Sequence, residues 1–208
     1  MYRNTIKLSL LFIAIILLGC DSPTPKLIPL KNNDVIVAFG DSLTQGVGVK
    51  RKDSYPSVLE AFTGLTVINA GISGETTHGG LKRFQRVIDE YNPSLLILLE
   101  GGNDILRGVS YKQIENNLEK MIVIAQDLNI QLVFIGVPEK SLFSDSAPFY
   151  TTLSEKYNLV FEPKIISKLM RSPSKKSDSI HFNKDGYALM AKEIYELLLE
   201  SGALSSID

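Results

Sequence analysis

Only one cysteine and two histidines occur among the 208 residues of the chain. A single cysteine, Cys20, excludes a disulfide within the chain. The histidines, His78 and His181, lie 103 positions apart, so a multi-histidine zinc site is excluded as well. We therefore expect no bound metal ion.

The chain also lacks an excess of charge of one sign. Its formal net charge is −1, and it becomes −3 if Arg3 and Lys7 are removed with the first 19 residues. A weakly acidic domain offers no basic surface to nucleic acid, which we exclude as a partner. No internal repeat or low-complexity run is present, and the length suits one domain with a buried core.

No hydrophobic run is long enough to span a membrane. The apolar run from Leu8 to Leu18 has 11 residues, whereas a transmembrane helix needs about 17–25. Behind Arg3 and Lys7, such a run is typical of a signal peptide. It ends in Leu17-Leu18-Gly19-Cys20, which resembles the lipobox of bacterial lipoproteins, where the cysteine is lipidated and becomes the new N-terminus. The alternative is a plain secretory signal with an incidental cysteine.

The sequence thus predicts an exported bacterial lipoprotein, anchored in a membrane through Cys20 and facing the periplasm or the cell surface. Three prolines between residues 21 and 33 favour an extended linker. Asp21 resembles the inner-membrane retention signal of enterobacterial lipoproteins. We divide the chain into a signal peptide, a lipidated cysteine with a flexible tether, a folded domain and a tail, which are residues 1–19, 20–33, 34–202 and 203–208.

Short apolar runs alternate with amphipathic stretches throughout the predicted domain. Runs typical of strands buried on both faces are Val35–Phe39, Thr66–Asn69, Leu95–Leu99, Gln131–Gly136 and the weaker Leu159–Phe161. Helices are predicted at Tyr55–Phe62, Gly79–Glu90, Lys112–Leu128 and Asn183–Leu199. The alternation predicts a mainly parallel sheet between layers of helices, with functional residues beyond the carboxyl ends of the strands.

Polar motifs follow the first three predicted strands. Gly40-Asp41-Ser42-Leu43-Thr44 comes first, and its serine is either a nucleophile at a strand end or a simple helix cap. After the second strand, Gly74 is either a turn residue or a place where a bare backbone N–H approaches a substrate. After the third, the Asn103 amide either donates into the same cleft or merely favours a turn.

The chain has two histidines that could act as the base for the serine. His181 follows Asp178 by three positions just before the last helix, and a carboxylate at that spacing can orient an imidazole. The other reading of this pattern is a surface loop. His78 lacks such a carboxylate and is interpreted as a solvated loop residue. Asp104, beside Asn103, is expected to have a structural role.

Taken in order, these motifs resemble the SGNH/GDSL hydrolases from about Val35 to Leu199. The stretches 68–76 and 99–108 are similar to the branch of periplasmic acyl-CoA thioesterase I, lysophospholipase L1 and arylesterase. The resemblance implies a flavodoxin-like three-layer α/β/α fold with a five-stranded sheet, and chemistry that needs no cofactor. Phe182 stands where the family often has proline, and residues 137–144 fit the branch poorly.

The resemblance also implies a role for each residue. Ser42 is the nucleophile, His181 the base and then the acid, and Asp178 the residue that orients His181. The oxyanion hole consists of the Ser42 N–H, the Gly74 N–H and the Asn103 amide. Leu142, Phe143 and Phe149 either line an acyl groove or pack in the core.

Three functions compete at this point. The first is hydrolysis of carboxylic esters or thioesters, including lysophospholipids, through an acyl-enzyme on Ser42. The second is removal of O-acetyl groups from envelope carbohydrate. The third is a non-catalytic binding lipoprotein, against which the intact set of site residues argues. A small-molecule or lipid ester is the expected partner, and a monomer is favoured although the sequence does not fix the oligomeric state.

Overall fold

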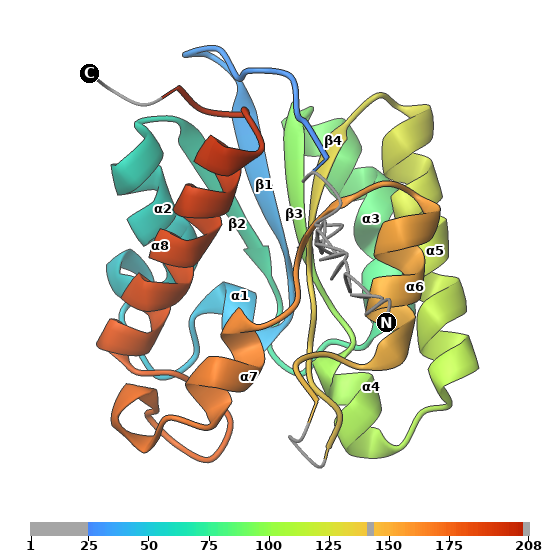
Figure 1. The fold of residues 1–208 in the computed structure, drawn as a ribbon, viewed down its shortest axis with the longest axis vertical. Coiled ribbons are helices and arrows are strands. Elements are labelled where there is room, and N and C mark those ends of the chain that lie inside the picture. Colours follow the sequence, from blue (N-terminus) through green and yellow to red (C-terminus); the bar gives the residue numbers. More distant parts are fainter. Residues whose placement is uncertain (1–24, 141–143, 206–208) are drawn as a thin grey trace, which may run out of the picture.

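A computed structural model describes residues 25–140 and 144–205 and shows a central sheet between two layers of helices (Figure 1). The predicted signal peptide and Cys20 lie outside the described residues. Within those two ranges, no helix combines the length and the apolar character needed to cross a membrane.

All five strands of the sheet are parallel. In spatial order they are β2 (Thr66–Gly71), β1 (Val35–Gly40), β3 (Leu95–Leu99), β4 (Gln131–Ile135) and β5 (Val160–Glu162). Every residue of β3 is buried, because helices cover both faces of the sheet. This confirms the predicted three-layer α/β/α fold with a five-stranded parallel sheet.

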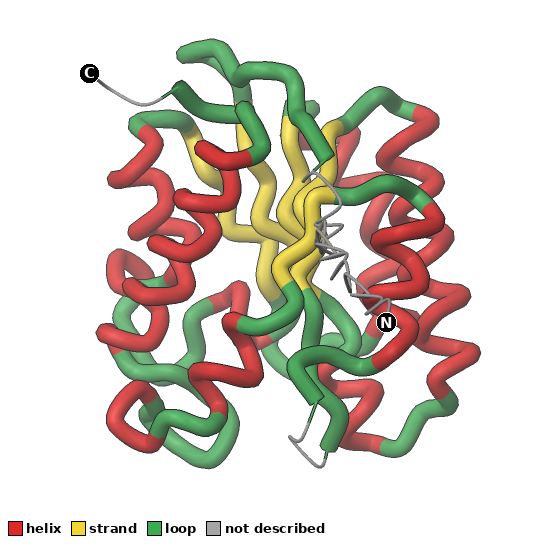
Figure 2. The backbone as a smooth tube through the Cα atoms, in the orientation of Figure 1, coloured by secondary structure: helices red, strands yellow, loops and turns green. Residues whose placement is uncertain are grey.

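The helices form the two outer layers of the fold (Figure 2). On one face, α2 (Tyr55–Thr63) packs against α8 (Lys184–Glu200). On the other face, α5 (Tyr111–Asp127) packs between α3 (Thr77–Tyr91) and α6 (Pro148–Lys156). The predicted apolar stripe of α5 is buried against the sheet and comprises Ile114, Leu118, Met121, Ile122 and Ala125.

Several short elements were not predicted. They are α1 (Ser42–Gln45), α4 (Gly102–Arg107), α6, α7 (Ile165–Met170) and the 3₁₀ helices η1 (Arg51–Asp53) and η2 (Pro173–Lys175). Elements of three to nine residues hold too few turns for a helical period to stand out in the sequence. Two of them matter for function, because α1 and α4 begin directly beyond the ends of β1 and β3.

The strand order reverses direction at β1. The chain leaves β1 toward β2 on one side, and β3 lies on the other side. Loops that leave adjacent strands toward opposite faces open a crevice at the carboxyl ends of those strands. The loops after β1 and β3 carry Ser42 and Asn103, so the topology itself brings these two motifs together.

Both ends of the described chain pack on the opposite pole of the sheet, at the amino ends of the strands. In the stretch predicted as a flexible tether, Leu27 N–H donates to the Ser201 carbonyl and Leu30 N–H to the Ala203 carbonyl, each at 2.8 Å. Ala203, assigned to the predicted tail, is fully buried. The folded unit therefore includes part of both flanking segments.

Candidate active site

Ser42 stands at the first position of α1, immediately beyond β1. Asp41 caps this helix by accepting a hydrogen bond from the Leu43 N–H at 2.9 Å, so the serine itself is not the cap. A side chain on Gly40 would lie 2.3 Å from the Leu99 carbonyl oxygen and as close to Thr44. Glycine at this position therefore lets the serine turn pack tightly against β3.

Ser42, His181 and Asp178 form a continuous hydrogen-bonded chain. His181 Nε2 lies 3.0 Å from Ser42 Oγ, and His181 Nδ1 lies 2.7 Å from Asp178 Oδ2. The other carboxylate oxygen of Asp178 accepts the backbone N–H groups of Ile180 and His181, each at 2.7 Å. These hydrogen bonds from His181 and Ile180 hold the pKa of Asp178 well below its usual range. The carboxylate is thus ionised and fixed against the imidazole.

The loop that carries His181 is closed on itself ahead of α8. A bridge joins Lys176 to Phe182, and the Ser177 N–H donates to the His181 carbonyl at 3.0 Å. The Phe182 ring is fully buried and packs edge-on against Tyr187, with 5.5 Å between ring centroids. The phenylalanine in place of the family's proline therefore anchors the loop through its ring.

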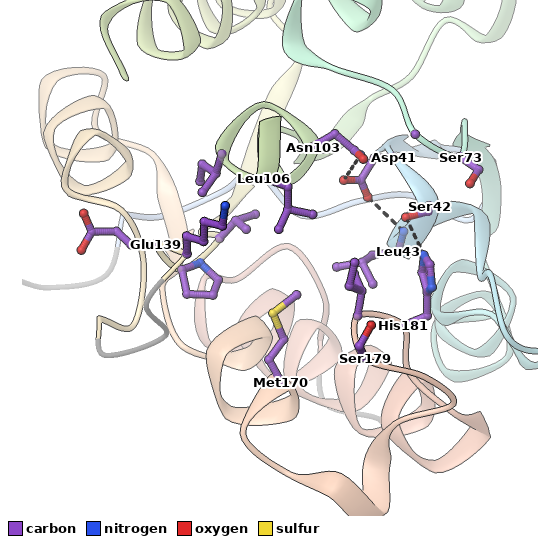
Figure 3. Close-up of a pocket in the computed structure, with 17 residues that line it drawn as sticks. Asp41, Ser42, Leu43, Ser73, Asn103, Leu106, Glu139, Met170, Ser179 and His181 are labelled. Atoms are coloured by element: carbon purple, nitrogen blue, oxygen red, sulfur yellow. Dashed lines mark hydrogen bonds between the residues drawn. The ribbon is translucent and has the colours of Figure 1, made fainter. Parts of the chain in front are cut away.

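Gly74 and Asn103 reach the same place from two other loops. Gly74 has a φ of +75°, and a side chain there would meet only Arg107 Nη2, at 3.7 Å. Backbone conformation rather than space thus favours glycine. Asn103 Nδ2 donates to Asp41 Oδ2 at 3.1 Å, which fixes its amide beside the serine turn. Figure 3 shows Asn103, Asp41, Ser42 and His181 around one cavity.

The two remaining candidates of the sequence lie elsewhere. His78 is exposed in the first turn of α3 and does not line the cavity. Asp104 is buried and accepts hydrogen bonds from the Thr77 N–H and the Thr77 hydroxyl, each at 2.8 Å. Asp104 thereby ties α4 to the start of α3, in line with the structural role expected of it.

The cavity beside Ser42 has a volume of about 250 Å³ and mainly apolar walls. Its apolar lining comes from α1, α4, the loop after β4, α7 and the His181 loop, and comprises Leu43, Ile105, Leu106, Val137, Pro138, Met170 and Ile180. Of the residues considered for an acyl groove, Phe149 packs in the core against Tyr150, with ring centroids 4.5 Å apart. Leu142 and Phe143 lie outside the described residues.

Comparison with known proteins agrees with this geometry. Residues 38–189 match the model of the GDSL-like lipase/acylhydrolase family. The chain is 30% identical to an arylesterase of Vibrio mimicus over 179 residues, which cover 81% of this chain and 90% of that protein. The chain belongs to the GDSL-like lipase/acylhydrolase family. It is therefore an ester hydrolase, as the family resemblance in the sequence predicted.

Two further relatives of this GDSL-like hydrolase cover most of its length. It is 26% identical to the thioesterase 1/protease 1/lysophospholipase L1 of Escherichia coli K12, over 79% of this chain and 85% of that protein. The crystal structure of AlinE4, an esterase of the SGNH-hydrolase family, superposes with a TM-score of 0.65 at 29% identity. That match covers 83% of this chain and 98% of AlinE4.

A cluster of buried charges lies behind the serine turn of the hydrolase. Arg83 of α3 forms a nearly buried ion pair with Glu75, and its Nη2 also donates to the Ala70 carbonyl at 2.9 Å. Glu100 is fully buried, and neither of its carboxyl oxygens has a hydrogen-bond partner among the described residues. Burial, together with the charges of Asp41 and Glu75, raises the pKa of Glu100 well above its usual value.

Asp41 is the member of this cluster that touches the site. Burial raises its pKa to about 6, against the opposing effects of the Leu43 N–H and His181. The sequence analysis did not single out Asp41, Glu100 or Arg83. A glutamate at the end of the apolar run 95–99 was the available signal, since a charge next to a buried strand needs a structural reason.

No group of three or more His, Cys, Asp or Glu side chains suited to a metal ion occurs in residues 25–140 and 144–205. The site consists of a hydroxyl, an imidazole, a carboxylate and amide donors around an apolar cavity. Such a set can carry out nucleophilic attack on a carbonyl.

Proposed function

We propose that the protein cleaves carboxylic esters or thioesters through a covalent acyl-enzyme on Ser42. The observation that carries this proposal is the chain of contacts from Ser42 Oγ through His181 to Asp178, at 3.0 Å and 2.7 Å, beside an apolar cavity. A serine hydroxyl is a weak nucleophile until an adjacent base accepts its proton. His181 has the position of that base and Asp178 the position that holds its tautomer.

In the first half of the reaction, Ser42 Oγ attacks the carbonyl carbon while its proton passes to His181 Nε2. The carbonyl oxygen becomes an oxyanion that accepts hydrogen bonds from the Ser42 N–H, the Gly74 N–H and the Asn103 amide. His181 then donates the proton to the leaving oxygen or sulfur, and the acyl group remains on Ser42. In the second half, water loses a proton to His181 and attacks the acyl carbon. The bond from that carbon to Ser42 Oγ breaks, His181 returns the proton to Ser42 Oγ, and the carboxylic acid leaves.

The apolar lining of the cavity supports an acyl chain as the group held beside Ser42. Burial of a chain's methylene groups there contributes about 0.8 kcal/mol each. The names of the relatives, an arylesterase and a thioesterase/lysophospholipase, support esters and thioesters as substrates. The cavity volume of about 250 Å³ supports short to medium acyl groups. A carbohydrate acetyl ester would leave most of the apolar surface unused.

Three variants test the catalytic assignment. Ser42→Ala and His181→Ala are expected to lower kcat on p-nitrophenyl esters by about 10⁴-fold or more. A fluorophosphonate probe should label the native protein and not Ser42→Ala. His78→Ala is the matched control, because this exposed histidine lies outside the cavity, and its activity should stay at the native level. Full activity in His181→Ala would refute the assignment of the base.

Substrate class is tested with p-nitrophenyl esters of increasing chain length alongside O-acetylated glycans. We expect kcat/KM to rise as the acyl chain grows to fill the apolar cavity and to fall when the chain exceeds it. Turnover of the acetylated glycans without turnover of longer acyl esters would establish the carbohydrate esterase function instead.

We also propose that the protein is an exported lipoprotein with Cys20 as the lipidated residue. The positively charged start, the apolar run of 11 residues and Leu17-Leu18-Gly19-Cys20 support this assignment. Two or more acyl chains would give stable membrane attachment. Cells should incorporate a fatty-acid label into the native protein, and Cys20→Ala should lose both the label and the need for detergent in extraction. A labelled Cys20→Ala protein would contradict the proposal.

A further inference from the structure

Residues 25–30 are fastened to one end of the domain. Gln131, the first residue of β4, holds Ile28 on both sides, accepting its N–H at 2.5 Å and donating to its carbonyl at 3.0 Å. Lys26 Nζ donates to the carbonyl of Glu200, the last residue of α8, at 2.7 Å. Together with the bonds of Leu27 and Leu30 to the end of the chain, these contacts fix the segment at the amino ends of the strands.

The catalytic cavity lies at the other end. Every loop that lines it leaves the carboxyl end of a strand or precedes α8. The length of helix α8 gives the distance between the catalytic end and the fastened N-terminal segment. The helix begins three residues after His181 and ends at Glu200, where Lys26 is bound. Its 17 residues span about 24 Å at a rise of 1.5 Å per residue. Figure 1 shows the described N-terminal segment and residues 137–140, which follow β4, at opposite ends of the sheet.

The chain between Cys20 and this fastening is short. Five peptide steps separate Cys20 from Pro25, which gives a reach of at most about 18 Å. That reach is less than the length of α8, so an anchor at Cys20 cannot come to the catalytic end of the domain. An anchor formed by the apolar run itself would leave the chain at the same pole.

We propose that the membrane-attached enzyme stands with the amino ends of its strands toward the bilayer and its catalytic cavity facing away. The inference rests on the proposed membrane attachment. Its substrates are then esters or thioesters that are dissolved in the aqueous compartment or presented from outside the anchoring bilayer. In this orientation the cavity does not face the lipids of the membrane that holds the enzyme.

Exposed apolar side chains occur at both poles and do not by themselves fix the orientation. Ile28, Leu128 and Phe62 lie at the amino ends of the strands, and Ile72, Leu106 and Tyr111 lie at the catalytic end. The orientation rests on the fastening of residues 25–30 and on the short reach from Pro25 to Cys20.

Two labels on one helix test the orientation directly. Helix α5 runs from the catalytic pole to the membrane-facing pole, with exposed Lys112 near its start and exposed Asp127 at its end. The 15 steps between these residues span about 22 Å. Two variants of the full-length protein are made, one with an alkyne-bearing amino acid at position 112 and the other with it at position 127. A donor fluorophore is coupled to the alkyne in each. The protein is placed in vesicles of phosphatidylethanolamine and phosphatidylglycerol that contain an acceptor on the headgroups.

We expect severalfold more efficient energy transfer from position 127 than from position 112. Equal transfer, or stronger transfer from position 112, would overturn the orientation. If mass spectrometry finds Cys20 without lipid, its free thiol is coupled to a maleimide-headgroup lipid and the measurement is repeated. A failure of lipidation is thereby distinguished from a failure of the orientation, and catalytic failure shows separately with soluble p-nitrophenyl esters.

A functional measurement completes the test. Attachment should leave turnover of a soluble p-nitrophenyl ester unchanged, because the cavity faces the solution. It should give no acceleration with a fluorogenic lysophospholipid placed in the same vesicles, compared with the unattached protein. Faster hydrolysis of that lipid after attachment would show that the cavity reaches its own bilayer and would overturn the proposal.

Discussion

At the scale of single residues, the site depends on Asp41, the acidic residue directly before Ser42 in the serine motif. Asp41 caps α1 through the Leu43 N–H and holds Asn103 Nδ2 at 3.1 Å. One carboxylate thus positions both the nucleophile's helix and a donor of the proposed oxyanion hole. Asp41 acts through these neighbours, so it is a positioning residue rather than a catalytic one.

Asp41→Asn tests this positioning role. An amide offers one acceptor oxygen where the carboxylate offers two, so either Leu43 N–H or Asn103 Nδ2 loses its partner. We expect kcat on a p-nitrophenyl ester to fall by about 10²–10³, as for loss of an oxyanion donor, with a smaller change in KM. A native kcat in this variant would show that Asn103 is held by other contacts.

The same variant should change how stability depends on pH. Burial raises the pKa of Asp41 from 3.8 to about 6, so the folded state binds more protons than the unfolded state between these values. This contribution to stability is therefore present below about pH 4 and is lost as the pH rises through about 6. The free energy of unfolding of the native protein, relative to Asp41→Asn, should fall over that interval by up to about 3 kcal/mol. Urea denaturation at several pH values measures the difference, and a constant difference would contradict the raised pKa.

At the scale of elements, one arginine joins a helix to the ends of two strands. Arg83 projects from α3, pairs with Glu75 and donates to the carbonyls of Gly40 and Ala70, which end β1 and precede the end of β2. Its guanidinium also lies 4.0 Å from the centroid of the Phe39 ring. The loops that carry Ser42 and Gly74 are therefore fixed relative to α3.

Arg83→Met should destabilise the protein strongly, because Glu75 is then a buried charge without a partner. We expect a loss of about 3–5 kcal/mol in the free energy of unfolding. In Arg83→Met/Glu75→Gln the stranded charge is gone, and part of this loss should be recovered. Denaturation curves of Arg83→Met, Glu75→Gln and the double variant give the coupling energy. A double variant no more stable than Arg83→Met would show that the ion pair is not the main contribution.

At the scale of the whole molecule, the cavity lies at one pole of the domain and both ends of the described chain lie at the other. At that second pole Leu27 and Leu30 bond to Ser201 and Ala203. The strands and α8 separate it from the cavity. Changes at the pole of the chain ends should therefore affect stability and leave catalysis alone.

Gln131→Ala tests this separation of poles by removing both side-chain hydrogen bonds to Ile28. We expect a loss of about 1–3 kcal/mol in the free energy of unfolding, since each of the two bonds contributes roughly 0.5–1.5 kcal/mol. The kcat/KM for a soluble ester should be unchanged. Gln126→Ala is the matched control, because it removes one bond, to Tyr157, on a neighbouring surface. A drop in kcat/KM in Gln131→Ala alone would show that the poles are coupled.

The sequence by itself determined the elements whose pattern is local. Continuous apolar runs specify strands covered on both faces, and the three- and four-residue spacing in α5 specifies a buried stripe, so the layered fold was predictable. The motifs also named residues that the structure brings together. Ser42, Gly74, Asn103 and His181 lie around the cavity, and Asp178 contacts the far side of the His181 ring.

Features that depend on contacts between residues far apart in the sequence were decided only by the tertiary structure. The raised pKa values of Asp41 and Glu100 and the Arg83–Glu75 pair arise from burial among side chains far apart in sequence. The fastening of residues 25–30 likewise depends on Gln131, 103 positions from Ile28. Desolvation and hydrogen bonding act through space, and no local pattern along the chain encodes which groups are left in contact when the core closes.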